Sequence, residues 1–260
     1  MQLNSYSVLM SLYKNESPLY LSLSLESILK QSVPPKEIIL VVDGPISDDL
    51  KAILAQFQES LHLIQLNENH GLGYALAIGL KKCTSQLVIR MDTDDISLSD
   101  RAEIQLRYFQ DHPETSVVGG NILEFENSVD DQEKNLKKVP QNDEAIRHFA
   151  RKRNPMNHMT VMFRKQDVLA AGNYQTFLGF EDYYLWVRMM KKRYKFANVN
   201  QVLVYVRTNS KFVNRRRGFK YLKKELGFQK YLLNVHFITK QDYFKNVSIR
   251  CILRFLPSSI

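Results

Sequence analysis

The sequence predicts an α/β protein in which helices cover both faces of a mostly parallel central sheet. Short continuous runs of Val, Ile and Leu alternate with segments that place apolar residues at helical spacing, and this order recurs between residues 6 and 113. Strands that are apolar on both faces belong to parallel sheets buried between helices. The alternation and the apolar runs together therefore favour a doubly wound arrangement.

Each expected element is supported by its local pattern. The apolar runs predict four strands, over residues 6–13, 36–43, 61–67 and 86–92. The helical spacing predicts four helices between and after them, over residues 17–32, 48–61, 71–83 and 98–113. Pro18 just inside the first helix and Pro113 at the end of the last are typical helix boundaries.

Beyond residue 113 the alternation is less regular. The sequence predicts three further strands and one helix, the strands over residues 116–125, 158–165 and 196–207 and the helix over 180–193. Residues 126–143 are polar and charged, which indicates a mobile loop. We find no internal repeat and no low-complexity tract.

Composition limits the class of protein. With 260 residues and 44% hydrophobic content, the chain can bury one large core or two modest ones. Its two cysteines, Cys83 and Cys251, make neither a disulfide framework nor a thiolate metal site, which favours a reducing compartment. The sequence shows no signal-peptide pattern and no apolar run of the roughly 20 residues that span a bilayer. These features predict a cytoplasmic protein.

The net charge of +9 is concentrated at the end of the chain. Residues 211–260 hold twelve Lys or Arg and two Asp or Glu, a net +10, so that residues 1–210 carry −1. Cations alternate with Phe, Tyr and Leu at near-helical spacing over residues 214–238 and 243–256. Such helices bind an anionic membrane surface, pack on the α/β domain, or do both. We therefore expect a domain of residues 1–210 and a basic helical extension of residues 211–260.

The predicted topology brings four loops to one edge of the sheet. In a parallel sheet the loops that follow the strands open on the same edge, and ligands bind in the crevice there. The residues expected on this edge come directly after the four strands, at positions 13–16, 43–44, 67–70 and 92–95.

Three aspartates, Asp92, Asp94 and Asp95, lie within four residues on this edge. Hard cations such as Mg²⁺ and Mn²⁺ take oxygen ligands, often one or two carboxylates together with substrate phosphates. No G-x-G-x-x-G follows the first strand and no P-loop is present, so that a bound nucleotide would need a cation for its diphosphate. The alternative is an acidic turn without a ligand, with Ser97 or Ser99 capping the next helix.

A second acidic pair, Glu181 and Asp182, precedes the expected helix that bears the only tryptophan, Trp186. A carboxylate at this position is often a helix cap. In a cleft beside a bound metal–diphosphate it would instead act as a general base. The pair alone leaves both interpretations open.

Taken together, these motifs resemble glycosyltransferase family 2, the inverting nucleotide-sugar transferases with the GT-A fold. The resemblance covers residues 5–207 and rests on four segments in order: SVLMSLYKNE to VVDGP, RMDTDDISLSDR, NHMTVMFRK and FEDYYLWVRM. Within the family the chain is most similar to bacterial O-antigen and amylovoran-type transferases. Those enzymes usually add one sugar to an undecaprenyl-diphosphate-linked oligosaccharide.

The resemblance implies where the donor would bind. Tyr13 would stack on uracil, Glu16 would lie at the nucleoside, and Asp43 would accept the uracil N3–H. On the same reasoning the donor is a UDP-sugar.

The resemblance also implies a Mn²⁺ or Mg²⁺ site. Asp94 would bind the metal directly, Asp92 would contact the metal, one of its waters or the ribose, and Asp95 would support the loop. Arg90 would hold these carboxylates, or would serve only as a salt-bridge partner. Many relatives complete the site with a histidine after the last strand, and residues 206–218 contain none.

On the acceptor side, Asp182 would be the catalytic base and Glu181 its neighbour. His158 and Arg207 would face the acceptor or the diphosphate, although a buried histidine satisfied by the backbone is an equal alternative for His158. Three consecutive arginines, Arg215, Arg216 and Arg217, would form a lid over a diphosphate.

The function implied is inverting transfer of a hexose, glucose or galactose, to an undecaprenyl-diphosphate-linked sugar with formation of a β-linkage. The enzyme would work on the inner face of the plasma membrane in the synthesis of a surface polysaccharide. One alternative is an inactive family member that serves as a scaffold at the membrane surface. Another is a basic nucleic-acid-binding protein, against which count the absence of a recognition motif and the slightly acidic residues 1–210.

Overall fold

The computed structural model describes residues 5–126, 129, 134–177, 179–208 and 218–255. Its strands are β1 (Tyr6–Leu12), β2 (Glu37–Val42), β3 (Leu61–Gln65), β4 (Leu87–Arg90), β5 (Ile96–Ser97), β6 (Thr115–Phe125), β7 (Asn135–Lys137), β8 (Met162–Arg164) and β9 (Lys195–Arg207). Its α-helices are α1 (Pro18–Leu29), α2 (Asp48–Gln56), α3 (Leu72–Lys82), α4 (Arg101–Asp111), α5 (Asp143–Ala150), α6 (Lys165–Ala170), α7 (Glu181–Lys191), α9 (Gly218–Asn234) and α10 (Lys240–Phe255).

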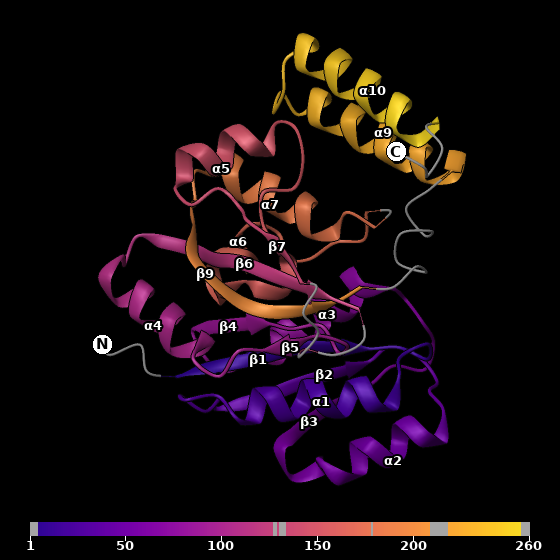
Figure 1. Cartoon of the computed structure of the whole chain (residues 1–260), viewed down its shortest axis with the longest axis vertical. Helices are drawn as coiled ribbons and strands as arrows, with labels where there is room; N and C mark the ends of the chain where they lie inside the picture. The colour runs from indigo at the N-terminus through magenta and orange to yellow at the C-terminus, as the bar shows by residue number, and fades with distance from the viewer. Residues whose placement is uncertain (1–4, 127–128, 130–133, 178, 209–217, 256–260) are drawn as a thin grey trace.

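The described strands form one sheet in the order β3-β2-β1-β4-β8-β6-β9-β5, with β7 paired to β6 (Figure 1). Strands β1 to β4 pair in parallel, which confirms the arrangement predicted for the first half of the chain. Strand β8 then lies antiparallel between β4 and β6, and β6 pairs in parallel with β9. The fold is therefore mixed α/β, with its parallel half at the N-terminal end of the chain.

Helices cover both faces of the sheet, as the sequence predicts. Along β1, Val8 and Met10 belong to the apolar cluster that contains α1, α2 and α4, while Leu9 between them joins the cluster that contains α3, α5 and α7. Successive side chains of a strand point to opposite faces, so both faces of this strand are buried. The continuous apolar runs in the sequence are explained by these two cores.

Several boundaries differ from the expected ones. The helix expected over 48–61 ends at Gln56 and continues as a 3₁₀ turn, Gln58–Ser60. Within the expected loop 126–143, β7 pairs with β6, so this segment is not entirely loop. Helix α5 follows directly, and the sequence did signal it, because the Asn142 side chain accepts a hydrogen bond from Ala145 N at 2.9 Å and acidic residues fill the first turn.

The basic extension forms two helices that lie together over α5 and α7 (Figure 1). Helix α9 buries Phe228 against Phe180 and Tyr183, with ring centroids 5.0 and 4.6 Å apart. On α10, Phe244 and Ile252 remain 67% and 60% exposed. The packing interpretation thus describes α9, whereas binding to a membrane stays a prediction. Among the described helices, none combines the length and the apolar content that crossing a bilayer requires.

The contact of α3 with the sheet depends on a glycine. A Cβ on Gly79 would lie 2.5 Å from Leu9 Cδ1 and 2.8 Å from Val41 Cγ2, both in the buried core. We expect Gly79→Ala to lower the free energy of unfolding by about 1–3 kcal/mol, since it overpacks this contact. Gly227→Ala on α9 is the matched control, because a Cβ there meets nothing within 4 Å. That change should raise stability by up to about 1 kcal/mol. Denaturant unfolding that gives the same shift for both would contradict the close packing.

Candidate active site

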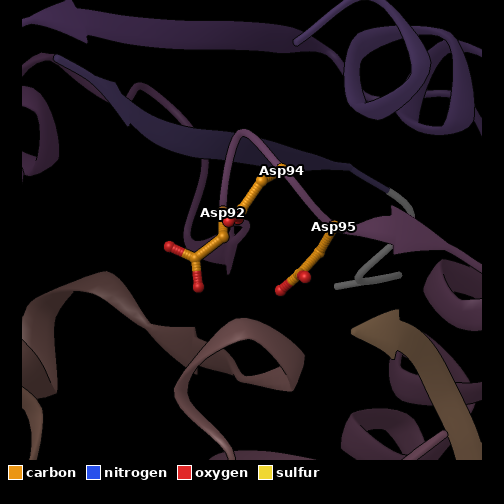
Figure 2. Close-up of side chains that lie close together, drawn as sticks. All are labelled: Asp92, Asp94 and Asp95. Atoms are coloured by element: carbon orange, nitrogen blue, oxygen red, sulfur yellow. The ribbon is translucent and has the colours of Figure 1, made fainter. Parts of the chain in front are cut away.

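The three aspartates of the sequence motif form one acidic turn after β4, residues 92–95 (Figure 2). One carboxylate oxygen from each of Asp92, Asp94 and Asp95 lies within 4.8 Å of the others. Helix α1 holds the turn, because Ser24 Oγ donates a hydrogen bond to the backbone oxygen of Asp92 at 2.8 Å. Asp92 and Asp94 are partly exposed, whereas Asp95 is buried. The turn thus offers two accessible carboxylates supported by a third.

Crowding of negative charge in the acidic turn changes its titration. Burial, together with repulsion from the carboxylates of Asp92 and Glu16, raises the pKa of Asp94 to about 7. The pKa of Asp95 is raised well above its usual range by burial and then by the charges of Asp94 and Asp92. A divalent cation would relieve this repulsion, and carboxylate oxygens are the ligands that Mg²⁺ and Mn²⁺ prefer.

Asp95 and Arg207 join the acidic turn to the end of β9. The Oδ1 of Asp95, which is 2% exposed, accepts a hydrogen bond from the backbone N of Arg207 at 3.0 Å. The Arg207 guanidinium lies 3.8 and 4.6 Å from the ring centroids of Tyr20 and Phe125. This bond ties Asp95 to β9, while support of a metal-binding turn by Asp95 and a contact of Arg207 with acceptor or diphosphate stay predictions.

Arg90 is the cation beside these carboxylates. It is the last residue of β4 and only 2% exposed, and its Nη2 donates to Asp92 Oδ1 in a short ion pair. Its Nε and Nη1 are buried and find no hydrogen-bond partner within the described part of the chain. The structure therefore places Arg90 as the partner of Asp92.

The loop after β1 reaches the acidic turn through Glu16. Its Oε2 accepts a hydrogen bond from Thr93 Oγ1 at 2.7 Å, and its Oε1 accepts one from Ser17 N at 2.8 Å. Tyr13, half-buried in the same loop, accepts a bond at its backbone oxygen from Glu16 N at 3.1 Å. Two of the residues expected at the nucleoside are thus beside the acidic turn.

Asp43 lies on the same edge and holds the loop after β3. Its carboxylate accepts hydrogen bonds from Asn69 Nδ2, His70 N and Gly71 N at 3.0, 2.8 and 2.8 Å. Gly44 follows with φ +91°, and a Cβ there would lie 2.8 Å from Asn69 N, so that only glycine fits. Most of the acceptor capacity of this carboxylate is therefore used within the protein, and its contact with uracil stays a prediction.

Asp182 occupies the first turn of α7. Its Oδ2 accepts a hydrogen bond from Asn154 Nδ2 at 2.5 Å, and its Oδ1 accepts one from Tyr183 N at 2.7 Å. Burial raises the pKa of Asp182, and the two hydrogen bonds oppose the rise without cancelling it. A carboxylate with a raised pKa that also lines a cavity is a candidate general base.

Glu181 rests against the start of α3. A Cβ on Gly73 would lie 2.7 Å from Glu181 Cγ and 3.0 Å from Gln175 O, so the glycine allows this close approach. The Oε1 of Glu181 accepts a hydrogen bond from Gly179 N at 3.1 Å. Gly73, the second glycine of the segment GLG, therefore leaves room for Glu181 of the acidic pair.

The other expected acceptor residues are placed differently. His158 is 9% exposed, and its Nε2 lies 3.0 Å from the hydroxyl of Tyr174. Burial and then the charge of Arg90 hold the pKa of His158 well below its usual range, so the ring is neutral. Its contact with an acceptor stays a prediction. Arg215, Arg216 and Arg217 lie outside the described residues.

No pattern in the sequence predicts that Asn154 binds the candidate base Asp182. The segment KRNPMN carries no pattern that singles out one asparagine, and the relation to Asp182 arises only because α5 and α7 pack side by side. The one available signal is that Asn154 is polar and precedes the strand expected over 158–165. That signal does not pair it with a carboxylate 28 positions later.

The fold and the acidic turn at the carboxyl ends of its parallel strands define a GT-A-like glycosyltransferase. The model for glycosyl transferase family 2 matches residues 7–173, more than half of the sequence. The chain belongs to this family. The matched range contains the acidic turn and ends before Asp182.

Two of the relatives are bacterial glycosyltransferases of similar length. The amylovoran biosynthesis glycosyltransferase AmsE of Erwinia amylovora is 42% identical over 98% of this chain and 96% of its own. The UDP-Gal:alpha-D-GlcNAc-diphosphoundecaprenol beta-1,3-galactosyltransferase of Escherichia coli is 34% identical over 98% of this chain and 92% of its own.

A solved structure supports the fold. The mannosyltransferase PcManGT of Pyrobaculum calidifontis, in complex with GDP-Man and Mn²⁺, aligns over 95% of this chain and 69% of its own. The TM-score is 0.65 and the sequence identity 14%. The GT-A fold predicted from the sequence is thus confirmed.

Metal binding at the acidic turn can be tested directly. We expect Asp94→Asn to weaken Mn²⁺ binding by about tenfold or more, since it removes a charged ligand. Titration of free Mn²⁺ by electron paramagnetic resonance, with and without a nucleoside diphosphate, gives the affinity. Asp100→Asn is the matched control, because Asp100 is exposed six residues further on and its side chain caps no backbone group. Equal affinities for the two variants would exclude Asp94 as a ligand.

Proposed function

We propose that this glycosyltransferase transfers a hexose, glucose or galactose, from a UDP-sugar to an undecaprenyl-diphosphate-linked sugar in the synthesis of a bacterial surface polysaccharide. The observation that carries the proposal is the presence of two separate sets of carboxylates. A crowded acidic turn stands at the carboxyl ends of the parallel strands, and a separate desolvated carboxylate, Asp182, lines a cavity. The Escherichia coli relative named above supports the donor and the acceptor class, and the Erwinia amylovora relative supports a role in polysaccharide synthesis.

The donor side would rest on the acidic turn. Asp94 and Asp92 would hold Mn²⁺ or Mg²⁺, since both are partly exposed and close together. Once bound, the ion would neutralise the charge that develops on the leaving diphosphate. Asp95 would keep the turn in place through its bond to β9. Tyr13 and Glu16 would meet the nucleoside from the loop after β1.

The acceptor side would depend on Asp182. In an inverting displacement, the acceptor hydroxyl attacks the anomeric carbon opposite the leaving diphosphate, so one base and one charge sink suffice. Asp182 would take the hydroxyl proton, which contributes a factor of order 10² to 10⁴. An α-linked sugar nucleotide would then give a β-linkage. Asn154 would orient the carboxylate through its bond to Oδ2.

The protein would work at the inner face of the plasma membrane. The exposed Phe244 and Ile252 of α10, together with the net charge of +10 on residues 211–260, suit an anionic lipid surface. Membership of the glycosyltransferase family accounts for the acidic turn, so nucleic-acid binding is not needed as an alternative function. The scaffold alternative requires an inactive site, and the presence of Asp94 and Asp182 argues against it.

A donor screen tests the proposal. UDP-glucose, UDP-galactose and their two N-acetylhexosamine counterparts are offered with Mn²⁺ or with chelator to a synthetic sugar-diphosphate-lipid. We expect metal-dependent transfer from one of the two hexose donors, and loss of kcat by about 10²- to 10⁴-fold in Asp182→Asn with donor binding retained. Asp111→Asn, an exposed carboxylate at the end of α4, is the control. Normal turnover by Asp182→Asn would remove it as the base.

The pH profile gives an independent test of the base. Since Asp182 must be ionised to accept a proton and burial raises its pKa, kcat/KM at saturating Mn²⁺ should fall with decreasing pH at a pH above the ordinary aspartate range, about 3.9. The bond from Asn154 favours the charged form, so Asn154→Ala should move this acidic limb to higher pH. Asn200→Ala, at an exposed site on β9, should not move it. A limb that stays in place or moves to lower pH in Asn154→Ala would argue against Asp182.

A further inference from the structure

The first turn of α7 opens into a cavity that the basic extension helps to build. The cavity has a volume of about 550 Å³ and lies between Asp182, residues 152–154 and the two C-terminal helices. None of the three aspartates of the acidic turn lines it. The cavity beside the candidate base therefore does not include the carboxylates of the expected metal site.

Cations gather at this cavity in excess over carboxylates. Lys152, Arg153, Lys245 and Arg250 line it, and the acidic residues among the lining are Asp182 and Glu225. Arg250 pairs with Glu225, with an Nε–Oε1 distance of 3.7 Å. In the part of the chain that the structure describes, the other three cations have no ion pair with a carboxylate. A cavity with such an excess of positive charge suits a dianionic ligand.

Besides the charged residues and the amides of Asn154, Gln229 and Asn246, the cavity is lined mainly by aromatic and apolar side chains. Phe180, Tyr183, Tyr221 and Phe228 form one side of the cavity, and Ile249 of α10 forms part of its border. A mainly apolar pocket with a few placed charges is the usual design of a small-molecule site. The combination fits a ligand with a charged group next to an apolar one.

An apolar path leaves the cavity along α10. Lys245, Ile249 and Ile252 are spaced by four and three positions and therefore lie on one face of the helix. Lys245 and Ile249 line the cavity, and Ile249 and Ile252 are 45% and 60% exposed. A cationic residue followed by exposed apolar residues matches the order of a diphosphate and its attached lipid.

The geometry points to this cavity as the binding site for the diphosphate of a lipid-linked acceptor, with Lys152, Arg153 and Lys245 on its phosphate oxygens. The lipid would leave along Ile249 and Ile252, and the sugar attached to the diphosphate would reach Asp182. The assignment rests on the proposed function for the identity of the acceptor. It adds a binding role for the C-terminal helices that neither the acidic turn nor the α/β domain supplies alone.

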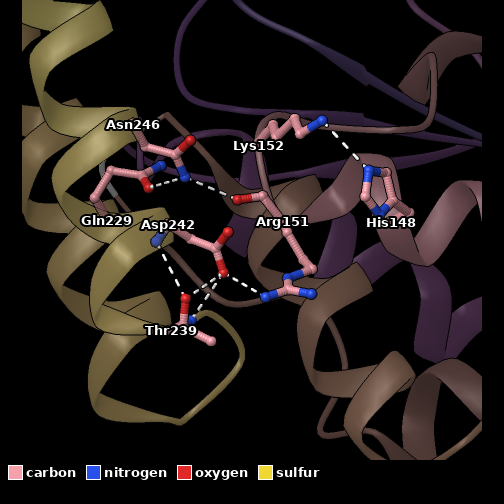
Figure 3. Close-up of polar contacts among 7 residues, drawn as sticks. All are labelled: His148, Arg151, Lys152, Gln229, Thr239, Asp242 and Asn246. Carbon is pink, nitrogen blue, oxygen red and sulfur yellow. Dashed lines mark hydrogen bonds and ion pairs between the residues drawn. The ribbon is translucent and has the colours of Figure 1, made fainter.

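Hydrogen bonds hold the cavity in shape (Figure 3). Asn246 of α10 donates to Arg151 O at 2.8 Å and to Gln229 Oε1 of α9 at 3.0 Å. Asp242 forms an ion pair with Arg151, and Arg250 donates to Lys152 O at 2.6 Å. These bonds fix α10 to residues 151–152, and Lys245 of α10 lines the same cavity as Lys152 and Arg153. The site is built before a ligand arrives.

A binding experiment separates this cavity from the donor site. Farnesyl diphosphate serves as the probe, with farnesol as its uncharged counterpart and UDP as the competitor. We expect the full-length protein to bind the diphosphate at least about tenfold more tightly than farnesol, because hydrogen bonds to charged groups are strong. Lys245→Glu and Arg153→Ala should each weaken it by about tenfold or more. Lys223→Glu is the matched control, since Lys223 is exposed on α9 and does not line the cavity.

Two outcomes would overturn the assignment. One is equal binding of farnesyl diphosphate by the wild-type protein and Lys245→Glu. The other is displacement of the probe by UDP with Mn²⁺, which would assign the cations to the donor diphosphate. The side chain of Lys245 is exposed, so we expect Lys245→Glu to unfold at the same temperature as the wild-type protein, which verifies that the variant is folded.

Kinetics distinguish failure of this assignment from failure of the proposed reaction. If transfer to a sugar-diphosphate-lipid occurs, Lys245→Glu should raise KM for that acceptor by about tenfold or more and leave KM for the UDP-sugar unchanged. Transfer with an unchanged acceptor KM would overturn the cavity assignment and keep the reaction. Charge-dependent binding of farnesyl diphosphate without any transfer would support the cavity and reject the reaction.

Discussion

The charge of Arg90 is the constraint on which the candidate site depends. This guanidinium is buried at the end of β4 and pairs with Asp92. Burial raises the pKa of Asp94, Asp95 and Asp182, and in each case the nearby charge of Arg90 opposes that rise. A buried cation is expensive unless it is compensated, and here the charges of Asp92 and Asp95 compensate it. One arginine thus stabilises the ionised forms of both the metal-site carboxylates and the candidate base.

The second constraint is the short segment 151–154, which contacts both helix α10 and the candidate base Asp182. Asn246 and Arg250 of α10 bind the backbone oxygens of Arg151 and Lys152, and two residues later Asn154 binds Asp182. A shift of α10 would therefore move the partner that orients the carboxylate. The basic extension is for this reason part of the site rather than an appendage, whether or not it also meets a membrane.

Local pattern predicted the parallel half of the fold well, because its strands are buried on both faces and read as continuous apolar runs. It did not reveal that β8 inserts antiparallel between β4 and β6, since strand order depends on packing between distant segments. The site divides in the same way. Asp92, Asp94 and Asp95 could be predicted because they are close together in the sequence, whereas the bond between Asn154 and Asp182 joins the loop after α5 to the first turn of α7. The sequence also did not predict that Asp43 holds the loop after β3, because its hydrogen-bond partners lie 26 to 28 positions away.

This division has a physical origin. The groups that would hold the donor come from loops that parallel pairing brings to one edge of the sheet, so the topology alone predicts their convergence. The groups that line the cavity beside Asp182 come from residues 152–154, α7, α9 and α10, and no repeating pairing rule relates these segments. Their arrangement follows from side-chain packing, above all that of Phe228 against Phe180 and Tyr183. Substitutions in α9 and α10 could therefore change the proposed acceptor site while leaving the acidic turn intact. This would give one fold a means to keep the proposed donor chemistry and vary its acceptor.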